Sequence, residues 1–112
     1  MTELESHELS VWEEDALVLS QTAFQLDQSR SDSVALAAAL NVNLDLWIGI
    51  KSLASSDAAR LPPNVKDNLA QLFHYVAETT LRNGTAMRTE ALDSQINLNL
   101  QLSEGLLEGQ AR

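Results

Sequence analysis

The sequence contains no cysteine, and this absence excludes disulfides, thiolate metal ligands and cysteine nucleophiles. It also lacks an apolar run of the about 20 residues that a helix needs to span a bilayer, because Asn43, Asp45 and Lys51 interrupt the longest such stretch. The first residues are acidic and do not have the basic start of a signal peptide. A chain of 112 residues with these absences is expected to be one soluble domain in a reducing cytoplasm, without a membrane segment.

Basic residues are scarce as well. The chain has 7 lysines and arginines against 16 aspartates and glutamates, which gives a net charge of −9. Nucleic-acid-binding domains normally carry a basic patch, so we expect no direct binding to nucleic acid. In the simpler interpretation the acidic surface provides solubility, and in the other it attracts a basic partner.

The most apolar part of the chain is the segment 34–53. On a helix, with about 100° between successive residues, its large apolar side chains cover most of the circumference and leave a narrow polar stripe that includes Asn41, Asp45 and Ser52. A helix that is apolar nearly all round is normally a central one. We therefore expect the other helices to pack around this segment.

The beginning of the chain is predicted to be a tail followed by a helix. Residues 1–8 are acidic and offer little to bury, so they are predicted to form a flexible tail. Ser10 and Glu13 match the S-x-x-E capping box, which predicts that the first helix begins at Ser10. Apolar residues three and four apart then form a seam along this helix: Leu9, Trp12, Ala16, Leu19, Ala23 and Leu26.

Local signals predict where the later helices begin and end. Asp32 or Ser31 is the expected cap of the second helix, and the adjacent prolines at 62–63 mark the start of the third. Gly84 follows Arg82 and Asn83 as its stop, and a last helix is expected at about 89–107. Residues 9–109 are thus predicted to form one all-α domain, a small bundle of about four antiparallel helices around the central apolar helix.

No pattern in the sequence predicts chemistry. His74 and Glu78 are four residues apart on one helix face, but a zinc site needs more ligands, and the other histidine is His7 in the predicted tail. We expect a solvated ion pair or hydrogen bond at His74. No G-x-S-x-G elbow and no phosphate-binding glycine loop is present, so we predict no catalytic residue, cofactor site or metal site, and a protein that is not an enzyme.

Polar residues on apolar helix faces allow two interpretations. Asn43 and Trp47 lie one turn apart on the second helix. They either belong to the core, with the indole N–H and the amide hydrogen-bonded inside, or border a groove for a partner helix. Asn99 and Ser103 lie within the apolar face of the last helix, where they either fix helix register or face a wet partner surface.

The order of several short motifs resembles the FlaF family of flagellar biosynthesis regulators. The matching motifs run from Glu14 to Leu107: E-x-x-L at Glu14–Leu17, A-L-x-x-N-x-x-x-W at Ala39–Trp47, L-P at Leu61–Pro62, then Leu69, Leu72, Tyr75 and Val76, I-N at Ile96–Asn97 and G-L at Gly105–Leu106. The chain departs from the family pattern in its acidic N-terminal segment, which has no tyrosine, and in Tyr75, which stands where a tryptophan is expected.

The resemblance implies a cytoplasmic, non-enzymatic protein that binds flagellin before secretion, supports flagellin synthesis and export, and works with the regulator FlbT. We take as candidate partner-binding residues Asn43, Trp47, Leu69, Phe73, Tyr75 and Asn99. An amphipathic helix of flagellin would lie in an apolar groove near Trp47 and the third helix. The alternative is a helical interaction or dimerisation module without flagellin specificity, using the seam at Trp12, Leu19 and Leu26. Neither monomer nor dimer is favoured by the sequence.

Overall fold

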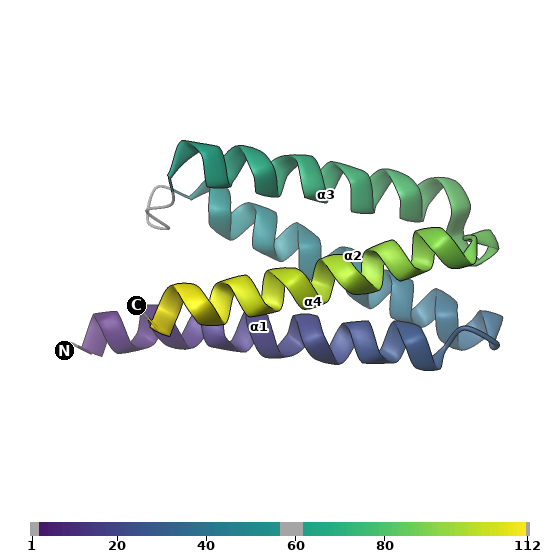
Figure 1. Ribbon diagram of the computed structural model, residues 1–112, viewed down its shortest axis with the longest axis horizontal. Coiled ribbons are helices and arrows are strands. Elements are labelled where there is room, and N and C mark those ends of the chain that lie inside the picture. The colour runs from purple at the N-terminus through teal and green to yellow at the C-terminus, as the bar shows by residue number, and fades with distance from the viewer. Residues whose placement is uncertain (1–2, 57–61, 112) are drawn as a thin grey trace.

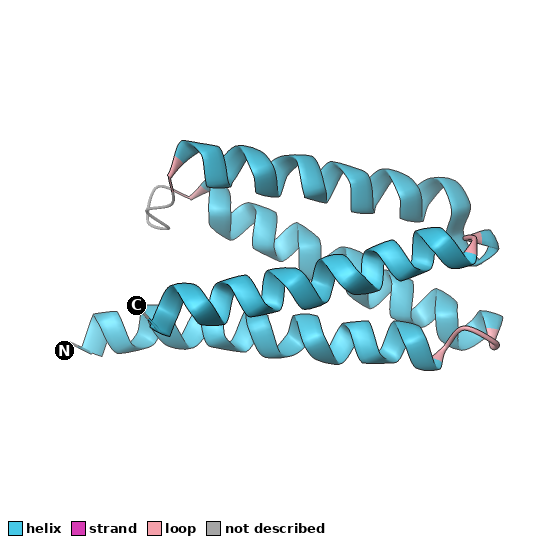
Figure 2. Cartoon of the chain, viewed as in Figure 1, coloured by secondary structure: helices cyan, strands magenta, loops and turns pink. Residues whose placement is uncertain are grey.

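The structure is a computed structural model that describes residues 3–56 and 62–111, with side chains described for 13–56 and 62–107. The described chain is almost entirely helical, and no strand occurs in it (Figure 2). The elements are α1 Glu3–Gln28, α2 Ser33–Ser55, α3 Pro63–Asn83, the short 3₁₀ turn η2 Gly84–Ala86, and α4 Thr89–Ala111. The prediction of a small all-α bundle is confirmed.

The helices run up and down in sequence order, so α1 and α3 point one way and α2 and α4 the other (Figure 1). Among the described helices, the closest backbone approach is between α1 and α4, followed by α2 with α3 and α1 with α2. The backbones of α3 and α4 approach each other only loosely. Because α2 and α4 are parallel, side chains one turn apart on α2 can meet side chains one turn apart on α4.

The predicted helix ends after α1 are confirmed by the capping geometry. The Asp32 carboxylate accepts from the backbone N–H groups of Val34 at 3.0 Å and Ala35 at 3.2 Å, which satisfies two of the free donors at the start of α2. Pro63 is the first residue of α3, where its missing N–H is not needed. Gly84 ends α3 with a positive φ of 50°, which glycine adopts without steric cost.

The start of α1 differs from the prediction. The helix begins at Glu3 rather than Ser10, so Ser10 lies inside the helix and is not its cap. Glutamates early in a helix interact favourably with the positive end of its dipole. This effect favours a helix in the acidic residues that were predicted from the sequence to form a flexible tail. Residues 3–8 therefore continue α1, and the division of the chain at residue 8 stays a prediction.

The core consists of two apolar clusters, one on each side of a buried polar layer. The first cluster lies near the α1–α2 connection and η2, and contains Leu26, Leu36, Ala39, Leu40, Met87 and Leu92. The second lies further toward the termini, and contains Leu19, Trp47, Ile50 and Val76, with partly buried leucines from α3 and α4 around them. The four predicted seam residues with described side chains, Ala16, Leu19, Ala23 and Leu26, are all buried.

The second helix is less enclosed than its composition predicts. Val34, Val42 and Ile48 of α2 are 80%, 46% and 45% exposed, so α2 forms one corner of the bundle and buries one broad face. By length and composition alone α2 is the one helix, among the described residues, that could cross a membrane, contrary to the expectation that no such stretch exists. Its inner face packs into the bundle through Trp47 and Ile50, and core helices of soluble proteins pass the same test.

Candidate partner-binding site

A chain of hydrogen bonds between buried side chains joins α2 to α4. The indole Nε1 of Trp47 donates to Asn99 Oδ1 at 2.9 Å, and Asn99 Nδ2 donates to Asn43 Oδ1 at 2.7 Å. Asn43 Nδ2 in turn donates to Gln95 Oε1 at 3.1 Å. All four side chains are fully buried, so each hydrogen bond satisfies a polar group that has no access to water.

The same layer reaches the other two helices. Gln95 Nε2 contacts Thr80 Oγ1 of α3 at 3.4 Å, and Asn99 Nδ2 contacts the carbonyl oxygen of Leu19 in α1 at 3.5 Å. One turn further along α4, Ser103 Oγ donates to the carbonyl oxygen of Ala16 at 2.7 Å. This buried polar layer therefore links all four helices and fixes their register.

Above this layer, α3 and α4 leave an open hollow on the surface. It has a volume of about 360 Å³ and is lined by Leu72, Tyr75, Ser94, Asn97, Leu98 and Gln101. The partly buried Leu72 and Leu98 pack on the second apolar cluster and form the floor, while the amides of Asn97 and Gln101 are exposed at the rim. The hollow follows from the loose approach of α3 to α4.

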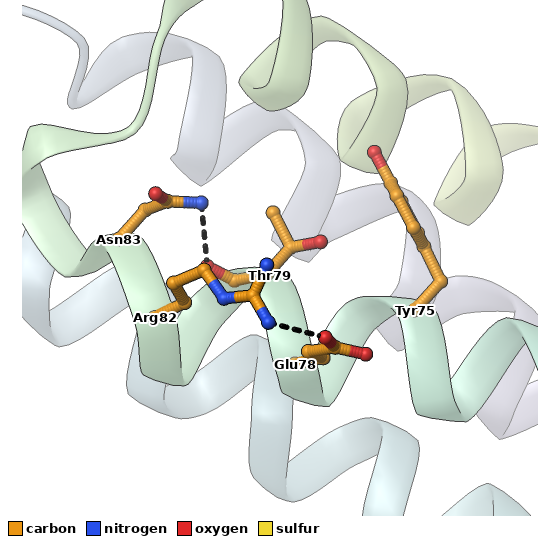
Figure 3. Close-up of a pocket in the computed structure, with 5 residues that line it drawn as sticks. All are labelled: Tyr75, Glu78, Thr79, Arg82 and Asn83. Carbon is orange, nitrogen blue, oxygen red and sulfur yellow. Dashed lines mark hydrogen bonds and ion pairs between the residues drawn. The ribbon is translucent and has the colours of Figure 1, made fainter.

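A second hollow of about 270 Å³ adjoins the first along α3, and Tyr75 lines both (Figure 3). Its other lining residues are Glu78, Thr79, Arg82 and Asn83. Arg82 Nη2 donates to Glu78 Oε1 at 2.6 Å, and Asn83 Nδ2 donates to the Thr79 carbonyl at 3.1 Å. The predicted contact between His74 and Glu78 is confirmed, with His74 Nε2 at 3.2 Å from Glu78 Oε2.

The structure separates the candidate partner-binding residues into two groups. Asn43, Trp47 and Asn99 belong to the buried polar layer, in agreement with the core interpretation, and they do not border a surface groove here. Leu69 is 6% exposed and also buried. The partner-binding role of these residues stays a prediction.

Phe73 and Tyr75 lie nearer the surface, on different sides of α3. Phe73 is partly buried and lies under Lys51 of α2, whose Nζ is 4.7 Å from the ring centre. Tyr75 is 39% exposed and stands in the α3–α4 hollow. Tyr75 is therefore the candidate that this structure offers to a partner, and Leu72, Leu98, Asn97 and Gln101 join it although the sequence did not assign them to a site.

Two of the three residues of the predicted dimer seam are not available to a second copy. Leu19 and Leu26 are fully buried between the helices of one chain, because the seam packs on α2 and α4 instead of on a partner. The side chain of Trp12 lies outside the described residues. Within the described part of the chain, no group of three or more histidine, aspartate or glutamate side chains is arranged to hold a metal ion.

A shallow hollow with a leucine floor, an exposed tyrosine and an amide rim is suited to binding a helix or a peptide by contact. Tyrosine provides a large, stiff contact area with one polar atom, and it is enriched among residues that dominate binding energy. The exposed amides can pair with polar side chains of a partner. The class defined by the fold and this surface is a small four-helix bundle with a polar core layer and an open α3–α4 face.

The particular family follows from comparison with known proteins. A family model described as flagellar protein FlaF matches residues 4–106, nearly the whole chain. The chain belongs to the FlaF family, and the resemblance seen in the sequence is confirmed. Searches of curated proteins and of solved structures give no match.

Proposed function

We propose that this chain binds flagellin in the cytoplasm before export, as a non-enzymatic chaperone and regulator that supports flagellin synthesis and secretion together with FlbT. The observation that carries the proposal is the family match over residues 4–106. Unassembled flagellin has amphipathic terminal segments that would otherwise aggregate, and a small helical domain can shield such a segment by contact along an apolar groove.

The α3–α4 hollow is the proposed binding face. Its floor, formed by Leu72 and Leu98, accepts apolar side chains of a flagellin helix, and Tyr75 covers one side of that helix. The rim amides of Asn97 and Gln101 pair with the polar edge of the same helix. Because the floor packs directly on the second apolar cluster, the face is supported by a fixed core rather than by a loop.

The test is a titration of the full chain with purified monomeric flagellin, in which calorimetry measures the binding affinity. Tyr75→Ala is expected to weaken binding by about tenfold or more, which is typical of a central aromatic contact. Phe24→Ala is the matched control, because Phe24 is an exposed aromatic on α1, away from the hollow, with 63% exposure. The proposal predicts wild-type affinity for the control variant.

Failure to bind flagellin would favour the alternative of an interaction module without flagellin specificity. Equal losses in Tyr75→Ala and Phe24→Ala would reject the α3–α4 hollow as the site while keeping flagellin as the partner.

A further inference from the structure

The outward side of α1 and the adjoining flank of α4 expose four large apolar side chains that the proposed function does not use. Leu17 and Phe24 on α1 are 58% and 63% exposed, and Leu100 and Leu107 on α4 are 41% and 51% exposed. In each helix the two residues are seven positions apart, so they share one stripe over two turns. We name these four side chains the α1–α4 strip.

The two stripes lie next to each other. The helices α1 and α4 are antiparallel and are the most closely packed pair in the bundle (Figure 1). Ser103 bonds to the Ala16 carbonyl and Asn99 to the Leu19 carbonyl, which places Leu100 at the level of the α1 turn between Leu17 and Phe24. The strip is therefore one surface across two helices, on the flank of α4 that faces away from α3.

Among the residues whose side chains the structure describes, the free charges beside the strip are acidic. Glu13 and Glu14 are exposed one turn before Leu17, and Glu104 is exposed between Leu100 and Leu107 on α4. Their sequence context is acidic as well, since residues 3–15 contain six carboxylates and no lysine or arginine: Glu3, Glu5, Glu8, Glu13, Glu14 and Asp15. Burial raises the pKa of Asp15, and the nearby charge of Glu14 raises it further.

The nearby basic group is already paired. Arg30 Nε binds Asp27 Oδ1 at 2.8 Å, and Arg30 Nη2 binds Asp93 Oδ1 of α4. Arg30 thus offsets one of the two carboxylate charges at the end of the strip near Phe24, whereas the described charged side chains at the end near Leu17 are acidic and unpaired by any arginine or lysine. An apolar strip with one acidic end is complementary to a helix with an apolar face and lysine or arginine beside it.

We propose that the α1–α4 strip binds a basic amphipathic helix of a second protein partner, separately from the α3–α4 hollow. The apolar face of that helix covers Leu17, Phe24 and the two α4 leucines, and its basic residues lie against Glu13, Glu14 and Glu104. An anionic membrane surface does not fit this site, because the carboxylates repel it.

The test measures binding of the full chain to two labelled synthetic peptides of about 18 residues, long enough to form a helix when bound. Both peptides have the same leucine stripe, and their polar faces are lysine in one and glutamate in the other. The lysine peptide is expected to bind with an affinity that falls as salt is raised, because salt screens the charge contribution. The glutamate peptide is expected not to bind.

Two variants and one control locate the binding. The double variant L17S/F24S is expected to weaken binding of the lysine peptide by more than about tenfold, since two large apolar contacts are lost. The double variant E13Q/E14Q is expected to weaken it and to reduce its salt dependence. The control V34S/L81S removes two apolar side chains that are 80% and 76% exposed on α2 and α3, and it should leave binding unchanged.

Three results would overturn the proposal. The first is equal binding of both peptides, and the second is an equal loss in the control. The third is a wild-type dimer in sedimentation that L17S/F24S converts to monomer, because the strip would then be covered by a second copy. Flagellin binding is measured in the same variants, and L17S/F24S should bind flagellin like the wild type. Failure of this proposal can therefore be distinguished from failure of the proposed function.

Discussion

Trp47 and Asn99 are joined inside the bundle by a hydrogen bond of 2.9 Å, across 52 residues of sequence. The bond between Asn43 and Gln95 spans the same 52 residues, because α2 and α4 are parallel and both partners move by one turn. A slip of either helix would leave the indole and the amides without partners in an apolar core. Each such buried, unsatisfied group costs about 1–3 kcal/mol, so the polar layer selects one register over its neighbours.

Replacing Trp47 tests whether the indole supports the core. Trp47→Ala is expected to lower the free energy of unfolding by about 3–5 kcal/mol, the range for a large buried aromatic. Trp47→Phe keeps most of the ring but leaves Asn99 Oδ1 without its donor, and should cost about 1–3 kcal/mol. Urea denaturation measures both values. A Trp47→Ala variant as stable as the wild type would contradict the core assignment.

Asn43 and Asn99 should be energetically coupled. A double-mutant cycle with Asn43→Ala and Asn99→Ala is expected to give an interaction energy of about 0.5–3 kcal/mol, as for residues in one hydrogen-bond network. The matched control is a cycle that pairs Asn99→Ala with Asn41→Ala, since Asn41 is an exposed asparagine on α2. Additivity in the first cycle, within error, would show that the polar layer does not act as a unit.

Two glycines should respond to alanine in opposite directions. Gly84 has a φ of 50°, which alanine adopts only with strain, so Gly84→Ala should destabilise the protein by about 1 kcal/mol. Gly49 lies on the exposed side of α2 with no atom within 4 Å of an added methyl group. Alanine there should stabilise the helix by about 0.5–1 kcal/mol. Thermal melting compares the two, and changes of the same sign would contradict the assigned backbone geometry.

Asp15 should make stability depend on pH. Burial and then the charge of Glu14 raise its pKa in the folded state above the ordinary value of an aspartate. The folded protein then binds a proton at Asp15 more readily than the unfolded chain does. The destabilising effect of Asp15 therefore develops as pH rises from the unfolded pKa through the folded pKa, and it persists at neutral pH. Asp15→Asn is expected to be more stable than the wild type at pH 7, and this advantage should shrink as pH falls through the folded pKa and disappear below the unfolded pKa. An unchanged or lower melting temperature at pH 7 would contradict the assignment.

Helix ends were predictable because their signals are local. The Asp32 cap, the Pro63 start and the Gly84 stop each depend on one residue and its immediate backbone. The start of α1 was not predictable from a local signal. The S-x-x-E pattern at Ser10 and Glu13 lies inside a helix that begins at Glu3, so the pattern alone does not distinguish a helix start from a helix interior. The exposure of Val34, Val42 and Ile48 was hidden for another reason: composition gives the apolarity of a helix but not the number of neighbours that cover it.

The candidate site was only partly predictable. The sequence located Asn43, Trp47 and Asn99 as polar groups on apolar faces, but a single helix pattern cannot tell which helix meets them, and their partners proved to be one another. Tyr75 was found, whereas Leu98 and Gln101 were missed because the α3–α4 hollow depends on the spacing between two helices. The spacing of Ser94, Asn97 and Gln101 on one polar stripe of α4 was a signal that could have indicated this face.

Hydrogen exchange of the full chain with and without monomeric flagellin tests the central claim most directly. The account predicts slower exchange of backbone amides in residues 71–83 of α3 and 94–101 of α4 when flagellin is bound, with little change in residues 13–28 of α1. Saturating flagellin that leaves α3 and α4 unchanged, or protection confined to α1, would contradict it.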